Sequence, residues 1–314
     1  MACAFRTVLL LTSILRVMGR GAAAVSLLVV LVATSCAGGS TPLDQFAKAL
    51  GSSSPAVSAK AAAPIFWVDA PIAGDPSPIR AHVPKTGAVI VPGGVQLLPP
   101  PILPGPRRVA IQAGHWKTDE APDEFPNLRF QFGSSVGGID EVNVNLDIAD
   151  RVAVILRAKG LIVDVLPATI PPSYVADAFV SLHADDDGFG SATGFKIAHG
   201  FYRGPSEDGL VDALTMEYAA ATDLPLNDQV TDDMTDYYAF AWFRYEHALA
   251  PHTPAAIIEM GYLSNSDDRA LLIDRPNVVA QGVANGVLRF LAANSREALF
   301  ANAFVVPTVA APVP

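Results

Sequence analysis

The fold is decided by the segment IDEVNVNLDIADRVAVILRAKGLIVDVL, residues 139–166. Its apolar side chains recur at helical spacing over residues 141–159, and the following run IVDVLP, residues 162–167, has the length and β-branched content of a buried strand. A helix that leads directly into an apolar strand is half of a βαβ unit. The segment therefore predicts an α/β domain.

Outward from this segment the same alternation continues on both sides. The apolar runs VAIQAG (109–114) and AFVSLH (178–183) flank it, and AAIIEMG (255–261) follows later. Helical patterns occupy residues 207–221, 237–250 and 278–294 between and after these runs. We expect a three-layer α/β fold with a mainly parallel twisted sheet flanked by helices, spanning residues 108–294.

The N-terminal 36 residues have the anatomy of an export signal. Arginines precede the apolar run AAAVSLLVVLVA at residues 22–33, and small residues follow it. Because Met18-Gly19-Arg20 alone would supply a charged start, the natural start is either Met1 or Met18. The chain is predicted to be exported.

Cys36 ends this signal in a context that resembles the lipobox of bacterial lipoproteins. Lipidation of Cys36 would attach the protein by a lipid anchor to the outer face of the cytoplasmic membrane or cell envelope. The alternatives are simple secretion and a retained anchor, although the apolar run is short for a span. Cys3 is the only other cysteine, so the mature chain has no internal disulfide and no thiolate for catalysis or metal binding.

Composition limits the partners and divides the chain. The net charge of -10 and the lack of a basic cluster argue against nucleic acid as a partner.

Residues 37–107 are rich in Pro, Ala, Gly and Ser and are expected to form a linker, in which AVIV at 88–91 is either an edge strand or packs on the catalytic body. Residues 295–314 are expected to be a disordered C-terminal tail.

Four ionisable residues are expected at one edge of the sheet. His115 and His183 follow apolar strands, Glu259 lies near the end of another, and Glu141 opens the first long helix. Ligands of α/β proteins collect at the carboxyl ends of the strands. Two imidazoles and a carboxylate are a frequent catalytic zinc set, so Zn²⁺ is the expected cofactor at these ends.

Glu259 requires a separate explanation, because an unpaired carboxylate buried in an apolar strand costs several kcal/mol. A nearby cation or a bound water would remove this cost. The alternative is that Glu259 pairs with an arginine or a helix terminus.

The motifs VAIQAGHW, IDEVNVNLDIADRVAVILRAKGLIVDVL, ADAFVSLHADD and PAAIIEMGYLSN resemble, in this order, those of the zinc-dependent N-acetylmuramoyl-L-alanine amidases, the cell-wall amidases of type 3. The resemblance covers residues 108–292. It implies that His115, Glu141 and His183 bind zinc and that Glu259 is the catalytic residue. It also implies hydrolysis of the amide bond between N-acetylmuramic acid and L-alanine in peptidoglycan, by a zinc-activated water with Glu259 as general base.

Several positions depart from the family pattern. In the first motif, Gln112-Ala113 stand where the family usually has Asp-Pro. Trp116 replaces the usual glycine after the first histidine and either stacks on a sugar or packs at the rim. Asp185 stands where an asparagine is common and opens an acidic loop, and the Arg-containing stretch before His183 is missing. His199, His247 and His252 are further candidates for a proton donor or an extra ligand, with His252 expected nearer the pocket rim.

These departures keep two alternative functions open. One is a zinc amidohydrolase or peptidase that acts on a different amide, and the other is a non-catalytic wall-binding lipoprotein. The sequence shows no sign of an obligate protein partner.

Overall fold

The computed structural model describes residues 67–68, 81–82, 88–91, 94–100, 102, 104–201, 204, 206–301 and 304–307. The export signal, Cys36 and most of the predicted linker lie outside these residues. Within the described part, no helix is long and apolar enough to cross a membrane.

A five-stranded sheet forms the centre of the fold, in the order β10-β11-β9-β5-β8. The strands β5 (Arg108–Ala113), β8 (Ile162–Leu166), β9 (Ala178–Asp185) and β11 (Ala255–Tyr262) are parallel, and β10 (Lys196–Ala198) is an antiparallel edge strand. Each parallel strand coincides with one of the apolar runs of the sequence. The predicted, mainly parallel sheet is confirmed.

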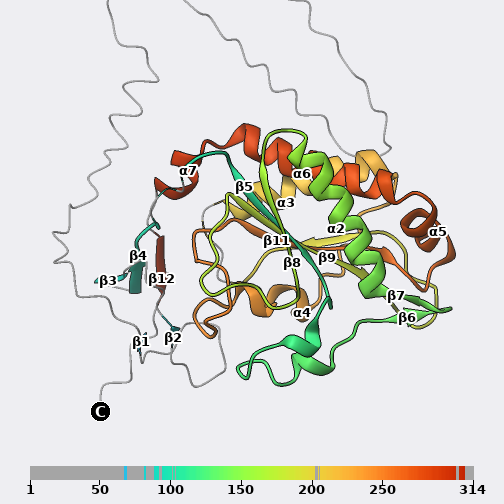
Figure 1. Ribbon diagram of the computed structural model, residues 1–314, viewed down its shortest axis with the longest axis horizontal. Coiled ribbons are helices and arrows are strands. Elements are labelled where there is room, and N and C mark those ends of the chain that lie inside the picture. Colours follow the sequence, from blue (N-terminus) through green and yellow to red (C-terminus); the bar gives the residue numbers. More distant parts are fainter. Residues whose placement is uncertain are drawn as a thin grey trace, which may run out of the picture. The chain divides into compact units, whose positions relative to one another are not determined.

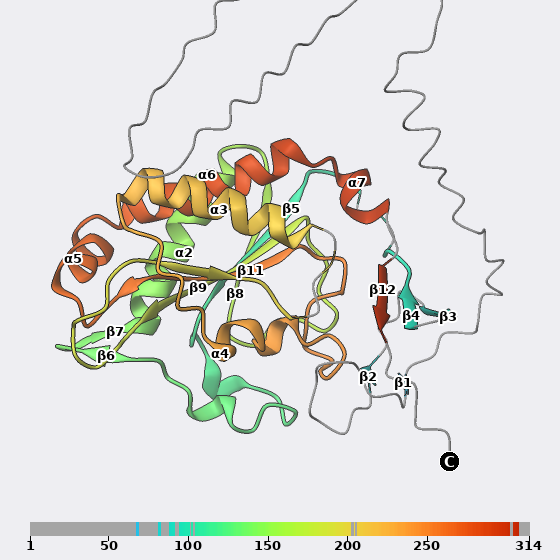
Figure 2. The same cartoon turned by 180° about the vertical axis from the view of Figure 1, so that it is seen from behind.

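Three long helices cover one face of this sheet (Figures 1 and 2). They are α2 (Glu141–Arg157), α3 (Glu207–Thr222) and α6 (Pro276–Ala293), and they agree with three of the four helices that the periodicity predicts. Their apolar stripes pack with the sheet into the main core, which includes Ile111, Ile148 and Leu182. A further short helix, α5 (Ser266–Asp274), begins at Asn265, whose side chain accepts hydrogen bonds from two backbone N–H groups of the first turn.

The other face of the sheet is covered by irregular chain, not by the helix predicted at residues 237–250. Only the short helices α4 (Asp232–Thr235) and η3 (Tyr238–Phe240) form there, followed by turns. Residues 239–243 are all buried, which a helix lying on one sheet cannot achieve because it buries only a stripe. Tyr237 and Phe240 pack instead into a second core against Phe179.

The predicted disordered tail is also wrong in part. Residues Arg296–Ala301 form helix α7, and Phe304–Pro307 form strand β12, which pairs with β4 (Gly94–Leu97). β4 pairs in turn with β3 (Ala88–Val91), so part of the predicted linker is a strand as well. Two-stranded pairs complete the fold: β1 (Trp67–Val68) with β2 (Ala81–His82), and β6 (Ser135–Val136) with β7 (Ile139–Asp140). The last seven residues of the tail lie outside the described part.

Helix α7 is ordered because its first residue reaches a buried carboxylate. Arg296 donates to both oxygens of Asp177, at 2.8 Å and 2.7 Å, and also to the carbonyl oxygens of Gly105 and Pro106. Arg107 donates to the same carboxylate at 2.8 Å, as does the backbone N–H of Arg108 at 2.7 Å. Asp177 therefore joins the start of β5, the start of β9 and the C-terminal helix.

Replacing Asp177 by asparagine is expected to lower the free energy of unfolding by about 3–5 kcal/mol, because two arginines lose their buried partner. Burial alone would raise the pKa of Asp177, but the hydrogen bonds from Arg296 and the Arg108 backbone outweigh it and lower that pKa. A lowered pKa means that this stability is present above the unfolded-state pKa of about 3.9 and is lost as the pH falls below it. Urea unfolding at several pH values measures both effects; an equal loss at pH 7 and pH 2.5 would contradict the assignment.

Candidate metal centre

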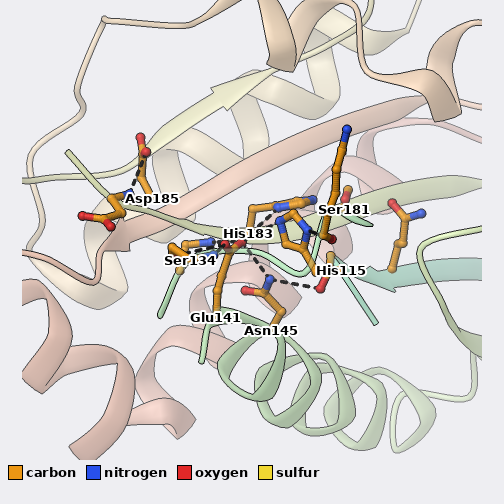
Figure 3. Close-up of polar contacts among 12 residues, drawn as sticks. His115, Ser134, Glu141, Asn145, Ser181, His183 and Asp185 are labelled. Atoms are coloured by element: carbon orange, nitrogen blue, oxygen red, sulfur yellow. Dashed lines mark hydrogen bonds and ion pairs between the residues drawn. The ribbon is translucent and has the colours of Figure 1, made fainter. Parts of the chain in front are cut away.

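Three elements bring His115, Glu141 and His183 together at the carboxyl ends of the strands (Figure 3). His115 lies two residues beyond β5 with a left-handed φ of 63°, Glu141 is the first residue of α2, and His183 lies in β9. Gly114 precedes His115 because any Cβ at this position would collide with the His183 ring. The turn after β5 can therefore direct His115 toward its two neighbours.

The three side chains are spaced as ligands of one ion. Glu141 Oε1 lies 3.3 Å from His115 Nε2 and 3.1 Å from His183 Nδ1, and all three ligand atoms lie within 4.8 Å of one another. Two donors on one tetrahedral zinc ion are about 3.4 Å apart. The donor set and its spacing fit a divalent metal ion.

Further hydrogen bonds hold the side chains of His115 and Glu141 in place. His115 Nδ1 lies 2.8 Å from the carbonyl oxygen of Gln131, which can accept only from a protonated nitrogen. This tautomer leaves Nε2 free to bind a cation. Glu141 Oε2 accepts from the backbone N–H of Ser134 at 2.9 Å, and Oε1 accepts from Asn145 Nδ2 at 3.1 Å and the Ala184 N–H at 3.2 Å.

The electrostatics keep the carboxylate charged. Burial favours a raised pKa for Glu141, but hydrogen bonds with His115 and His183 outweigh it and hold this pKa well below its ordinary value. Burial lowers the pKa of His183 and so favours its neutral form. A charged carboxylate beside a neutral imidazole is the protonation state that binds a metal ion.

Glu259 faces the same cavity, which has a volume of about 540 Å³ and is also lined by His115 and His183. In β11 its register partner on β9 is His183, so the two side chains leave neighbouring strands at the same level. Glu259 Oε2 is buried and has no hydrogen-bond partner among the described residues. Burial, together with the charges of Glu141 and Asp185, raises the pKa of Glu259 well above its ordinary value.

Lys196 is a charged neighbour of Glu259 that the sequence analysis did not select. It lies opposite Glu259 on the edge strand β10, lines the cavity and is buried. Its ammonium group pairs with Asp185 and lies 5.4 Å from the centre of the Tyr262 ring. The short apolar run around Lys196 gives no indication of its partner, which only the register reveals.

Of the remaining candidates of the sequence, Asp185 lines the cavity, whereas Trp116, His199 and His252 do not. Trp116 is half-buried and packs against the main core. His252 is buried but is not among the cavity-lining residues, so its expected place at the rim is wrong. His199 Nε2 lies 3.1 Å from Asp208. In the acidic loop, Asp187 accepts hydrogen bonds from the backbone N–H groups of Gly190 and Ala192.

Tyr237 completes the surroundings of His183 and was also missed by the sequence. Its hydroxyl lies 3.4 Å from His183 Nε2 and donates to Gln112 Oε1 at 2.9 Å, while Ser181 Oγ donates to it at 3.3 Å. His183 therefore presents Nδ1 to Glu141 and Nε2 to Tyr237. Tyr237 comes from the segment expected to be helical, where its side chain could not be assigned to the site.

Replacing Tyr237 by phenylalanine is expected to weaken metal binding about 10–100-fold, because His183 loses the oxygen that orients its ring. Competition with a chromophoric chelator measures the affinity directly. Tyr245→Phe is the matched control, since Tyr245 packs on Phe125 away from the cavity. Equal affinities of the two variants would show that Tyr237 does not position His183.

The sequence and the structure were compared with known proteins. Residues 109–289 match the family model described as N-acetylmuramoyl-L-alanine amidase, whereas no curated protein sequence matches. A solved structure of the catalytic domain of CwlV, an N-acetylmuramoyl-L-alanine amidase from Bacillus (Paenibacillus) polymyxa var. colistinus, is 24% identical, with 60% of this chain and 99% of that chain covered and a TM-score of 0.41. The N-acetylmuramoyl-L-alanine amidase AmiC2 of Nostoc punctiforme is 21% identical, with 60% of this chain and 98% of that chain covered and a TM-score of 0.42. The amidase from Clostridium difficile 630 is 19% identical, with 61% of this chain and 100% of that chain covered and a TM-score of 0.43.

Proposed function

Because the chain belongs to the N-acetylmuramoyl-L-alanine amidase family, which makes it a peptidoglycan hydrolase, we propose that it cleaves the muramoyl-alanine bond with Zn²⁺ bound by His115, Glu141 and His183. Glu259 is the general base of this reaction. One observation carries the proposal: a cluster of two imidazoles and a carboxylate shares a cavity with Glu259, whose buried Oε2 has no hydrogen-bond partner among the described residues.

The chemistry of the ligands favours zinc over harder ions. Magnesium and calcium prefer six or more oxygen ligands, whereas this cluster offers two nitrogens and one carboxylate. A bound cation would also favour the charged form of Glu259 through its positive charge. The unpaired Glu259 carboxylate is thus consistent with a cation in this cavity.

Bound zinc and Glu259 have separate roles in the proposed reaction. When bound, zinc supplies a Lewis acid that polarises the scissile carbonyl and lowers the pKa of water. Glu259 Oε2 takes a proton from the attacking water as the new C–O bond forms, and returns it to the amide nitrogen as the C–N bond breaks. The products are the lactyl carboxylate of the sugar and a stem peptide with a free N-terminal alanine.

The test is digestion of purified peptidoglycan by the full-length protein with Zn²⁺. Release of intact stem peptides with a free N-terminal alanine, detected by mass spectrometry, is the expected result. No release with any divalent metal between pH 5 and pH 9 would overturn the proposal.

A different amide substrate remains the second candidate, because Gln112-Ala113 replace the usual start of the first motif and the Arg-containing stretch is missing. Gln112 is buried and is not among the cavity-lining residues, but it accepts a hydrogen bond from the Tyr237 hydroxyl at 2.9 Å. Turnover of short peptide amides that lack muramic acid, at a rate above that on muropeptides, would favour this second function.

We also propose that the protein acts outside the cytoplasmic membrane and is anchored there by a lipid on Cys36. The support is the sequence alone: an apolar run followed by small residues and a cysteine. Mass spectrometry of the mature protein from membranes would detect an acylated N-terminal Cys36. Soluble, unmodified protein in the medium would identify simple secretion instead.

A further inference from the structure

Two exposed phenylalanines flank a residue of the catalytic cavity. Phe130 is 76% exposed and Phe132 is 61% exposed, and Gln131 between them lines the cavity. We call these three residues the aromatic rim. Large apolar side chains exposed as a pair beside a cavity mark a binding surface more often than isolated ones do.

The aromatic rim is fixed to the metal centre at several points. The carbonyl oxygen of Gln131 lies 2.8 Å from His115 Nδ1, and the N–H of Ser134 donates to Glu141 Oε2 at 2.9 Å. Between them Gly133 has φ of 82° and passes so close to the ligands that an added Cβ would lie 2.8 Å from His115 and 2.9 Å from Glu141. The backbone next to the two rings is therefore held close to the metal ligands.

The charges around the cavity differ from wall to wall. Asp233 and Asp236 line the wall formed by α4 and the residue after it. Lys196 on the edge strand β10 pairs with Asp185 at the end of β9. The aromatic rim itself carries no charge, and its neighbour Arg129 is engaged by Asp123 at 2.6 Å and the Ala121 carbonyl at 2.7 Å. A neutral ligand fits the rim better than a charged peptide does.

We propose that the aromatic rim binds a sugar ring of the peptidoglycan glycan strand, with the phenyl faces against the C–H face of the pyranose and the Gln131 amide on its hydroxyl or acetamido groups. The negative faces of aromatic rings attract polarised C–H groups, and the amide both donates and accepts hydrogen bonds. This inference rests on the proposed function, since a substrate cut at the lactyl arm keeps its sugar within a few bonds of the reacting carbon.

The test measures binding in the absence of cleavage. Full-length protein loaded with Zn²⁺ is titrated with glycan strands from which the stem peptides have been removed. The double variant Phe130→Ala/Phe132→Ala is expected to bind about tenfold or more weakly than the wild type. Met216→Ala is the matched control, because Met216 is 53% exposed on α3 and does not line the cavity.

Replacement of both rings by leucine separates stacking from general hydrophobic contact. The leucine variant is expected to lose glycan binding as the alanine variant does, whereas tryptophan at both positions is expected to retain it. Wild-type affinity of the alanine or leucine variant for glycan would overturn the inference, as would a wild type that binds free stem peptides and no glycan.

Failure of this inference can be distinguished from failure of the proposed function. If the wild type releases stem peptides but rim variants bind glycan normally, the sugar site is wrong and the amidase assignment stands. If glycan binding depends on Phe130 and Phe132 while no amide is cleaved, the sugar site is supported and the proposed activity fails. Because both rings are exposed, unchanged melting temperatures would show that the variants are folded.

Discussion

Replacing Glu259 by glutamine is expected to lower kcat on peptidoglycan about 10²–10⁴-fold, the usual contribution of a general base. Glutamine keeps the size of the side chain but cannot take a proton from water. The change is also expected to leave the protein folded, because the Glu259 carboxylate is buried without a partner for Oε2 among the described residues, and a neutral amide is less costly to bury than an ion.

Zinc content distinguishes loss of the base from loss of the metal ion. Glu259→Gln is expected to retain stoichiometric zinc by elemental analysis, because Glu259 is not part of the cluster formed by His115, Glu141 and His183. Glu246→Gln, at an exposed carboxylate outside the cavity, serves as the control. Near-normal turnover in Glu259→Gln would refute its role as general base, and loss of zinc would identify it as a ligand instead.

The strands and the polar residues at their ends were predictable from the sequence for a physical reason. Buried parallel strands need continuous apolar runs, so β5, β9 and β11 stand out without any alignment. Parallel strands also place their carboxyl ends at one edge, which brings His115 and His183 together once the runs are identified. Glu141 could be placed at the same edge because it is the first residue of an amphipathic helix that follows the first of these strands.

The other site and core residues depend on pairings between residues that are distant in the sequence, and hydrophobic periodicity does not predict such pairings. Lys196 reaches Glu259 through an antiparallel register, and Arg296 reaches Asp177 across 119 positions. Tyr237 belongs to a segment whose apolar pattern resembles that of a hydrophobic helix. The segment is instead mostly irregular chain and packs on the second face of the sheet. In each case the decisive partner comes from another element, so the local sequence carries no signal for it.

Replacing Glu141 by glutamine is expected to weaken zinc binding about 10²–10³-fold, since zinc sites of four ligands bind with about 10–16 kcal/mol in total. The carboxylate also accepts hydrogen bonds at both oxygens, from Ser134 at 2.9 Å and from Asn145 at 3.1 Å. An amide there must turn its NH₂ group toward one of these donors. We therefore expect a further loss of about 1–3 kcal/mol in the free energy of unfolding.

The neighbouring carboxylate offers a control that separates these effects from the helix position. Asp140 is exposed and immediately precedes Glu141, so Asp140→Asn removes the same charge from the same helix terminus. Asp140→Asn is expected to keep zinc affinity and turnover, while Glu141→Gln loses both and regains part of its turnover at high zinc concentration. If Glu141→Gln binds zinc as tightly as the wild type, the ion is not held by this triad, and the shared cavity with Glu259 would need another explanation.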